Sequence, residues 1–220
     1  MVHPLNSVIL HLQNIRPDYL SSAVIGESEV WDVELGLNPG EGIIVWGPSG
    51  QGKSTFLRIL YGLETRYRGR LLVNGTSPPS DSYLFWPTVR SEEVAFVTQD
   101  FGLFGEISGW ANLRLLPSLA REVDRPQIEQ WASQLGIEAL LERSPATWSQ
   151  GQRQRFALLR ALASPFSWLL LDEPISHLDP EAAERTLDLM ISVCKERGAG
   201  WILAQQTAES PIPADRIFKV

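Results

Sequence analysis

Cysteine and histidine are both scarce in this 220-residue sequence, which holds one cysteine and three histidines. The single cysteine, Cys194, excludes an internal disulfide framework and a cysteine-rich zinc site. No apolar run approaches the about 20 residues that a membrane-spanning helix needs. The first residues also lack a basic stretch followed by an apolar one, so no secretory signal is expected there. These absences favour a soluble, cytoplasmic globular protein.

The charge balance is acidic, with 26 Asp and Glu against 19 Lys and Arg and a formal net charge of −7. Net acidity disfavours nonspecific binding of nucleic acid, and no nucleic-acid partner is expected. Arg153, Arg155 and Arg160 fall on a predicted helix together with Phe156 and Leu159. At that spacing the arginines are interpreted as solvated or ion-paired positions rather than a nucleic-acid surface.

Short apolar runs alternate with longer helical patterns along the chain. Helices are predicted over 53–60, from about Gln152, and after Asp179, where Asp179 can cap and Pro180 suits the first helical position. In the last helix Ala183, Leu187, Met190 and Cys194 share one face. Strands are predicted over 8–12, 30–35, 42–46, 71–73, 94–97, 168–171, 201–204 and 216–220. This alternation predicts an α/β domain with a largely parallel sheet, and 101–149, with no clear strand, is predicted to be a helical insertion.

A phosphate-binding loop pattern lies between a predicted strand and a predicted helix. Its glycines Gly50 and Gly52 allow the backbone to wrap its N–H groups around phosphate oxygens at the positive end of the helix. Lys53 can reach the β- and γ-phosphates, and the Ser54 hydroxyl can bind Mg²⁺. The predicted ATP-binding residues of this loop are Gly47, Pro48, Ser49, Gly50, Gln51, Gly52, Lys53, Ser54 and Thr55.

A second polar group follows other predicted strands. Asp172 ends an apolar strand and can orient Mg²⁺, and Glu173 is the candidate to polarise an attacking water. Gln99 follows the strand 94–97, where its amide could meet the metal or the attacking water. Ser149 precedes a predicted helix, whose start offers another anion site.

The combined motifs resemble those of the nucleotide-binding subunit of an ATP-binding cassette (ABC) transporter. The segment 47–55 is similar to the Walker A motif, 169–173 to Walker B, and Gln99 to the Q-loop. The segment 148–152 resembles the family signature Leu-Ser-Gly-Gly-Gln, and 176–179 resembles the D-loop. The opening strand resembles that of the family and places Tyr19 as the aromatic that stacks on adenine.

The resemblance implies an ABC-type P-loop NTPase fold, with a mostly parallel sheet, an antiparallel β subdomain and an inserted helical subdomain. It divides one domain into a core of 1–99 and 150–220 and a helical subdomain of 100–149. It implies that two ATPase subunits pair head to tail, each ATP lying between the Walker A segment of one chain and Ser149, Gly151 and Gln152 of the other. Mg²⁺ would be held by Ser54, Gln99 and Asp172.

Partners and location follow from the same resemblance. The chain would power a separate membrane permease subunit from the inner face of the cell membrane, and its partner cassette is either a second copy or a different chain. The stretch 99–104 is similar to the group that includes lipoprotein-release and macrolide-export ATPases. Phe101, Leu103, Phe104 and Trp110 belong either to a groove for the permease or to helical-subdomain core, and both readings stay open.

The sequence departs from the family where a histidine is usual after the strand 201–204. Gln206 aligns with that histidine, with Gln205 as the alternative. Glutamine can donate a hydrogen bond to a γ-phosphate but cannot carry a proton, so hydrolysis is expected to be slowed. In the signature, Trp148 and Gln150 replace the usual Leu and Gly, and Trp148 is expected to be a packing residue. Two other functions stay open: a soluble non-transport ABC ATPase and a nucleotide-gated binding module.

Overall fold

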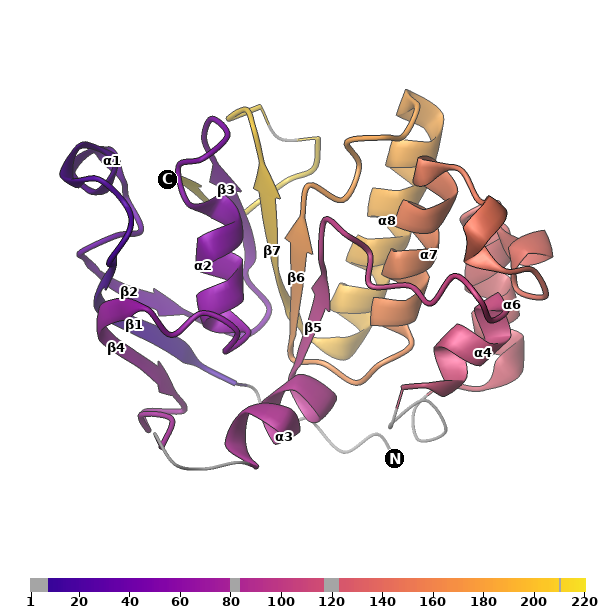
Figure 1. Ribbon diagram of the computed structural model, residues 1–220, viewed down its shortest axis with the longest axis horizontal. Helices are drawn as coiled ribbons and strands as arrows, with labels where there is room; N and C mark the ends of the chain where they lie inside the picture. The colour runs from indigo at the N-terminus through magenta and orange to yellow at the C-terminus, as the bar shows by residue number, and fades with distance from the viewer. Residues whose placement is uncertain (1–7, 80–83, 117–122, 210) are drawn as a thin grey trace.

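The computed structural model describes residues 8–79, 84–116, 123–209 and 211–220. The chain forms two β-sheets with helices packed on and beside them (Figure 1). The larger sheet has five strands, all paired in parallel. Their order across the sheet is β5 (Val94–Val97), β6 (Trp168–Asp172), β7 (Gly200–Gln205), β3 (Gly42–Trp46) and β8 (Arg216–Lys219).

Strand β6, which lies between β5 and β7, is buried along its whole length, which explains its uninterrupted apolar sequence. Because side chains alternate between the two faces of a strand, Leu169 and Leu171 join one hydrophobic cluster, while Trp168 and Leu170 join the other. The core of the protein therefore lies on both faces of this sheet.

Helices cover both faces of the parallel sheet (Figure 1). On one face, α2 (Lys53–Leu60) contributes Phe56 and Leu57 to the cluster that contains Leu170. On the other, α7 (Gln150–Leu162) and α8 (Pro180–Arg197) pack against Leu169 and Leu171. The helices that begin at the P-loop and at the signature thus lie on opposite faces.

The smaller sheet is antiparallel, with β1 (Leu10–Pro17) between β2 (Glu34–Leu37) and β4 (Tyr67–Val73). Leu10, Leu12 and Ile15 of β1 point into the cluster that also receives α2. A short helix, α1 (Ser22–Glu27), follows β1. The expected combination of a mostly parallel sheet and an antiparallel β part is confirmed.

The described residues of 101–149 contain helices and no strand. They form α4 (Gly109–Arg114), α6 (Arg125–Gln134) and two 3-10 turns, Glu138–Leu140 and Pro145–Thr147. Their apolar side chains join the cluster of α7 and α8. In the part of the chain that is described, no helix combines the length and apolarity that a bilayer span requires.

The strand predicted over 30–35 is wrong in its first half. Val30 and Trp31 are buried but not extended, because both of their N–H groups bond to the Ser28 hydroxyl. Asp32 then adopts a positive φ of 56°, which breaks an extended chain. The pairing with β1 starts only at Glu34.

Some helices were predicted correctly from the sequence, and others were not anticipated. The predicted helix over 53–60 is confirmed as α2, and the cap at Asp179 is confirmed by its Oδ1, which accepts from Ala182 N. In α8, Ala183 is only partly buried, and Ala182 lies in the core instead. Helices α1 and α3 (Phe85–Glu92) were not anticipated.

Among the described residues, the three arginines of α7 bond to backbone carbonyls and form no ion pair with an acidic side chain, which corrects their interpretation from sequence. Arg153 donates to the carbonyls of Pro145 and Ala146, and Arg155 donates to that of Leu135. Arg160 donates to the carbonyls of Phe101 and Gly102 in the turn after β5. One helix therefore anchors three separate loops through their backbones.

A buried and an exposed leucine provide a test of which residues form the core. Leu170 is fully buried in β6, and Leu63 is 57% exposed after α2. We expect Leu170→Ala to lower the free energy of unfolding by about 2–5 kcal/mol, because it removes buried methyl groups and leaves a cavity. We expect Leu63→Ala, the same chemical change, to alter it by about 0.5 kcal/mol or less. Urea denaturation of both variants measures the difference, and equal losses would contradict the two-sided core.

Candidate functional site

The candidate site lies where four parallel strands end. The loop 47–52 follows β3, Gln206 follows β7, Asp172 and Glu173 lie at the end of β6, and Gln99 follows β5. The carboxyl ends of parallel strands share one edge of a sheet, which is where ligands bind in open α/β folds. The sheet topology therefore gathers most of the residues that the sequence singled out.

The P-loop backbone has the conformation that phosphate binding requires. Gly50 and Gly52 have φ values of 83° and 108°, a region that favours glycine. A side chain at Gly52 would come within 2.9 Å of Leu20 Cδ1. Helix α2 starts directly after, at Lys53, so its first N–H groups face the loop.

The Lys53 ammonium group is held inside the loop. Its Nζ donates to the carbonyl oxygens of Gly47, at 2.7 Å, and Pro48, at 3.1 Å, and the residue is 5% exposed. It also lies 3.9 Å from Glu173 Oε1. The positive charge is thus placed next to the carboxylate that ends β6.

Oxygen ligands suitable for a magnesium ion line a cavity of about 450 Å³ that includes Ser54, Gln99 and Asp172. Hard cations such as Mg²⁺ bind oxygen donors, so this set fits the predicted metal. Burial raises the pKa of the Asp172 carboxyl, while a hydrogen bond from Ser54 acts in the opposite direction. Burial disfavours the negative charge of this carboxylate, so a cation bound beside it would stabilise its ionised form.

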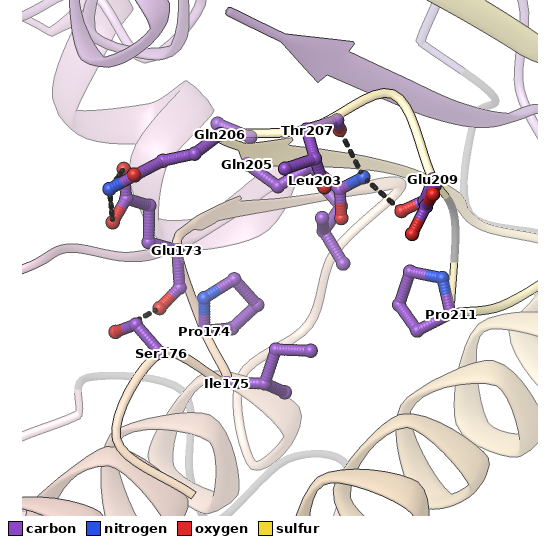
Figure 2. Close-up of a pocket in the computed structure, with 11 residues that line it drawn as sticks. Glu173, Pro174, Ile175, Ser176, Leu203, Gln205, Gln206, Thr207, Glu209 and Pro211 are labelled. Carbon is purple, nitrogen blue, oxygen red and sulfur yellow. Dashed lines mark hydrogen bonds between the residues drawn. The ribbon is translucent and has the colours of Figure 1, made fainter. Parts of the chain in front are cut away.

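Glu173 and Gln206 meet on the other side of β6, in a cavity of about 600 Å³ (Figure 2). Gln206 Nε2 lies 3.4 and 3.3 Å from the two carboxylate oxygens of Glu173. Gln205 points elsewhere, and its Nε2 donates to the carbonyls of Thr207 and Glu209. Of the two glutamines, Gln206 is the one that reaches the Glu173 carboxylate.

The signature residues cap α7. The Ser149 hydroxyl accepts from Gln152 N at 3.2 Å, and Gln152 Oε1 accepts from Ser149 N at 2.8 Å. A side chain at Gly151 would approach the His177 carbonyl to 2.9 Å, so this glycine permits close packing. Trp148 is buried and packs edge-on against Phe156, with 4.8 Å between the ring centroids, which confirms it as a packing residue. Neither Ser149, Gly151 nor Gln152 lines the two cavities described above.

Tyr19 lies next to the P-loop helix and is 47% exposed. Its hydroxyl donates to Glu64 Oε2 at 3.1 Å and accepts from the Thr55 hydroxyl at 3.2 Å. The guanidinium of Arg66 lies over its ring at 5.1 Å from the centroid. Hydrogen bonds from Arg66 lower the pKa of Glu64 to about 2. The ring is therefore fixed beside Thr55, where a base could stack.

Sequence reasoning missed one glutamine of the site, Gln154, and considered Gln205 only as the alternative to Gln206, without its bonds to the carbonyls of Thr207 and Glu209. Gln154 lies in α7 and donates to the carbonyl of Glu173 at 2.8 Å. A signal for it existed, because Gln154 falls on the apolar face of a helix, four residues before the buried Leu158. No comparable pattern predicts the bonds that Gln205 makes.

Comparisons with known proteins agree on one family. The model of the ABC transporter family matches residues 30–176. The chain is 30% identical to the lipoprotein-releasing system ATP-binding protein LolD of Ruegeria sp. (strain TM1040), over 97% of this chain and 96% of that protein. It is 35% identical to the glutamate/glutamine/aspartate/asparagine transport ATP-binding protein BztD of Rhodobacter capsulatus, over 85% of this chain and 72% of that protein.

Solved structures agree on the fold. A dimeric ATP-binding cassette in a post-hydrolysis state, bound to ADP and Pi, matches with a TM-score of 0.76 and 24% identity. The match covers 90% of this chain and 88% of that one. With the P-loop, the two carboxylates that end β6 and a family model that spans most of the chain, the protein belongs to the ABC transporter family as an ATP-hydrolysing nucleotide-binding domain.

Proposed function

We propose that this chain is the ATPase subunit that powers a separate membrane permease. The observation that carries the proposal is the convergence of Lys53, Asp172 and Glu173 at one edge of the parallel sheet. A cation, a metal-binding carboxylate and a candidate base are the three groups that phosphoryl transfer to water requires. The names of the relatives, which include an amino-acid transport subunit and a lipoprotein-release subunit, support a role in transport.

In this proposal the P-loop backbone and Lys53 hold the phosphates of ATP, and Tyr19 stacks on the adenine. Ser54, Asp172 and Gln99 hold Mg²⁺, which when bound offsets negative charge on the phosphate oxygens. Glu173 accepts a hydrogen bond from the attacking water and aligns it with the γ-phosphate. The 3.9 Å contact between Lys53 and Glu173 puts the phosphate-binding and water-orienting groups side by side.

The active form is proposed to be a head-to-tail dimer, of two copies or of this chain with another cassette. The support is geometric: α2 and α7 start on opposite faces of one sheet, so their N-termini cannot cradle the same phosphate chain. Each start is instead half of a site. Ser149, Gly151 and Gln152 then contribute to the ATP held by the partner, and ATP binding closes the pair.

The permease is proposed to dock beside the turn after β5. A cavity of about 160 Å³ lies there, between Phe101 and Leu103 on one side and Pro145 and Ala146 on the other. Phe104, nearby in sequence, is 60% exposed, whereas Phe101 is buried in the core. In this proposal the stretch therefore contributes both to the permease groove and to the core of the helical subdomain. Docking would place the protein on the inner face of the membrane, with 100–149 as its helical subdomain.

Hydrolysis by the purified chain tests the proposal. We expect Mg²⁺-dependent release of phosphate that rises faster than linearly with protein concentration, because two chains complete each site. Glu173→Gln is expected to lower kcat by about a hundredfold, since an amide cannot take a proton from water. Binding of ATP by this variant should persist. A parent chain no more active than Glu173→Gln at any concentration would refute hydrolysis by a homodimer.

The two glutamines after β7 provide a matched pair. We expect Gln206→His to raise kcat by about tenfold, because imidazole can carry a proton where an amide cannot. Gln205→His should not raise it, because the Gln205 amide is bonded to the loop carbonyls of Thr207 and Glu209. Steady-state phosphate release measures both, and a gain only in Gln205→His would show that the alignment of Gln206 is wrong.

The buried carboxylate predicts a pH-dependent cost in stability. The pKa of Asp172 is raised on folding, so the folded protein resists losing this proton and the free energy of unfolding falls as pH rises from the unfolded to the folded pKa. Asp172→Asn removes this loss, and Ser54 can still donate to an amide oxygen. Without nucleotide, we expect the variant to be more stable than the parent at neutral pH and to lose that advantage in acid.

Urea denaturation at several pH values measures this difference, and hydrolysis by the same variant should be lost. The exposed Asp188 of α8 offers a control, since Asp188→Asn should leave the stability unchanged. Equal stability of parent and Asp172→Asn at neutral pH would contradict the desolvation argument.

A further inference from the structure

The side chain of Gln154 is a polar group in the apolar interior of the protein. It projects from α7 and is 2% exposed. Its Nε2 donates to the Glu173 carbonyl at 2.8 Å and lies 3.4 Å from Ser176 Oγ, and its Oε1 accepts from His177 N at 3.2 Å. Both ends of the amide are thus used by one short turn, 173–177.

The turn contains a strained residue. Glu173 has a φ of 51°, a left-handed conformation that is uncommon for residues other than glycine and is energetically unfavourable. Its N–H donates to the Ala204 carbonyl at 3.0 Å, and its own carbonyl accepts from Gln154 Nε2 at 2.8 Å. The same carbonyl accepts from Ser176 Oγ at 3.1 Å (Figure 2). Such a conformation persists only where surrounding contacts hold it.

We propose that Gln154 is a positioning residue, which holds the backbone of Glu173 in this conformation and so aims its carboxylate. The proposal rests on the role of Glu173 as the group that orients water. The backbone conformation sets where the side chain leaves the main chain. In the left-handed form the carboxylate reaches Lys53 on one side and Gln206 on the other. Without the Gln154 amide, the Glu173 carbonyl loses its shortest hydrogen bond and keeps the hydroxyl and the N–H of Ser176, at 3.1 and 3.4 Å. His177 N loses its acceptor.

The position of Gln154 gives this contact a second consequence. The amide lies in the first turns of α7, the helix that starts with the signature residues 149–152. Within the proposed dimer, that start faces the ATP bound to the partner, whereas Glu173 acts on the ATP bound to its own chain. The close contact of Gly151 with the His177 carbonyl joins the same two segments. Gln154 therefore connects the two ATP sites through one buried hydrogen-bonded contact.

Gln154→Met tests the positioning role, because methionine has a similar length and no hydrogen-bonding amide. We expect kcat to fall by about tenfold to a hundredfold while the KM for ATP is unchanged, since the P-loop is untouched. Gln134→Met, on the exposed face of α6, is the matched control and should retain the parent kcat. Ser176→Ala removes the other side-chain donor to the same carbonyl from an exposed position, and it tests the same role if Gln154→Met does not fold. It should lower kcat with unchanged KM.

A second measurement distinguishes a change in the orientation of residue 173 from a loss of structure in α7. ATP-driven dimerisation is followed by gel filtration in the Glu173→Gln background, with and without Gln154→Met. Dimers of equal stability support the proposal, because only the aim of residue 173 has changed. Loss of the dimer would overturn it, since Gln154 would then act on the signature helix itself.

The outcomes also separate this inference from the proposed function. If the parent hydrolyses ATP and both Gln154→Met and Ser176→Ala keep its kcat, only the positioning role fails. If the parent is no more active than Glu173→Gln, the role of Glu173 fails, and that of Gln154 falls with it.

Discussion

The parallel pairing of β5, β6, β7 and β3 is the constraint on which the site depends. Each of these strands is covered by apolar side chains, and β6 is buried on both faces, so their register is fixed by the core rather than by the loops. The polar residues come immediately after the buried runs. Their separation in sequence is large, but the sheet brings them to one edge in a fixed order.

The same edge of the sheet holds several groups whose placement lowers the stability of the folded protein. The ammonium of Lys53 is withdrawn from water and bonded to carbonyl oxygens, the Asp172 carboxyl is buried, and Glu173 has a strained backbone. None of these features improves packing. Each places charge in a low-dielectric site, where it acts more strongly on a charged ligand than it would in water. The two-sided core stabilises the fold sufficiently to retain them.

Most of the framework could be predicted from the sequence because it depends on local pattern. The P-loop, the apolar run of β6 and the capped start of α8 carry signals within a few residues. The first half of the strand predicted over 30–35 could not be recognised as a turn, because it depends on the Ser28 hydroxyl and on the left-handed Asp32. Alternating apolar residues look the same whether the backbone is extended or bent.

The site was predictable as a set of residues but not as a set of contacts. Motif and order identified Glu173 and Gln206, yet the proximity of the Gln206 amide to the Glu173 carboxylate depends on the neighbouring ends of β6 and β7. The bonds from Gln154 to the turn after β6 join residues 19 positions apart. Such contacts between elements are set by packing, which a single sequence does not display.

The arginines of α7 have a consequence for how this protein can change over evolution. All three donate to backbone carbonyls of other loops, never to a side chain there, in the contacts described. A backbone carbonyl is present whatever residue occupies the position. The loop beside the proposed permease groove can therefore exchange its side chains without losing its attachment to α7. The surface proposed for docking can therefore vary in sequence while the backbone that α7 holds in place keeps its position.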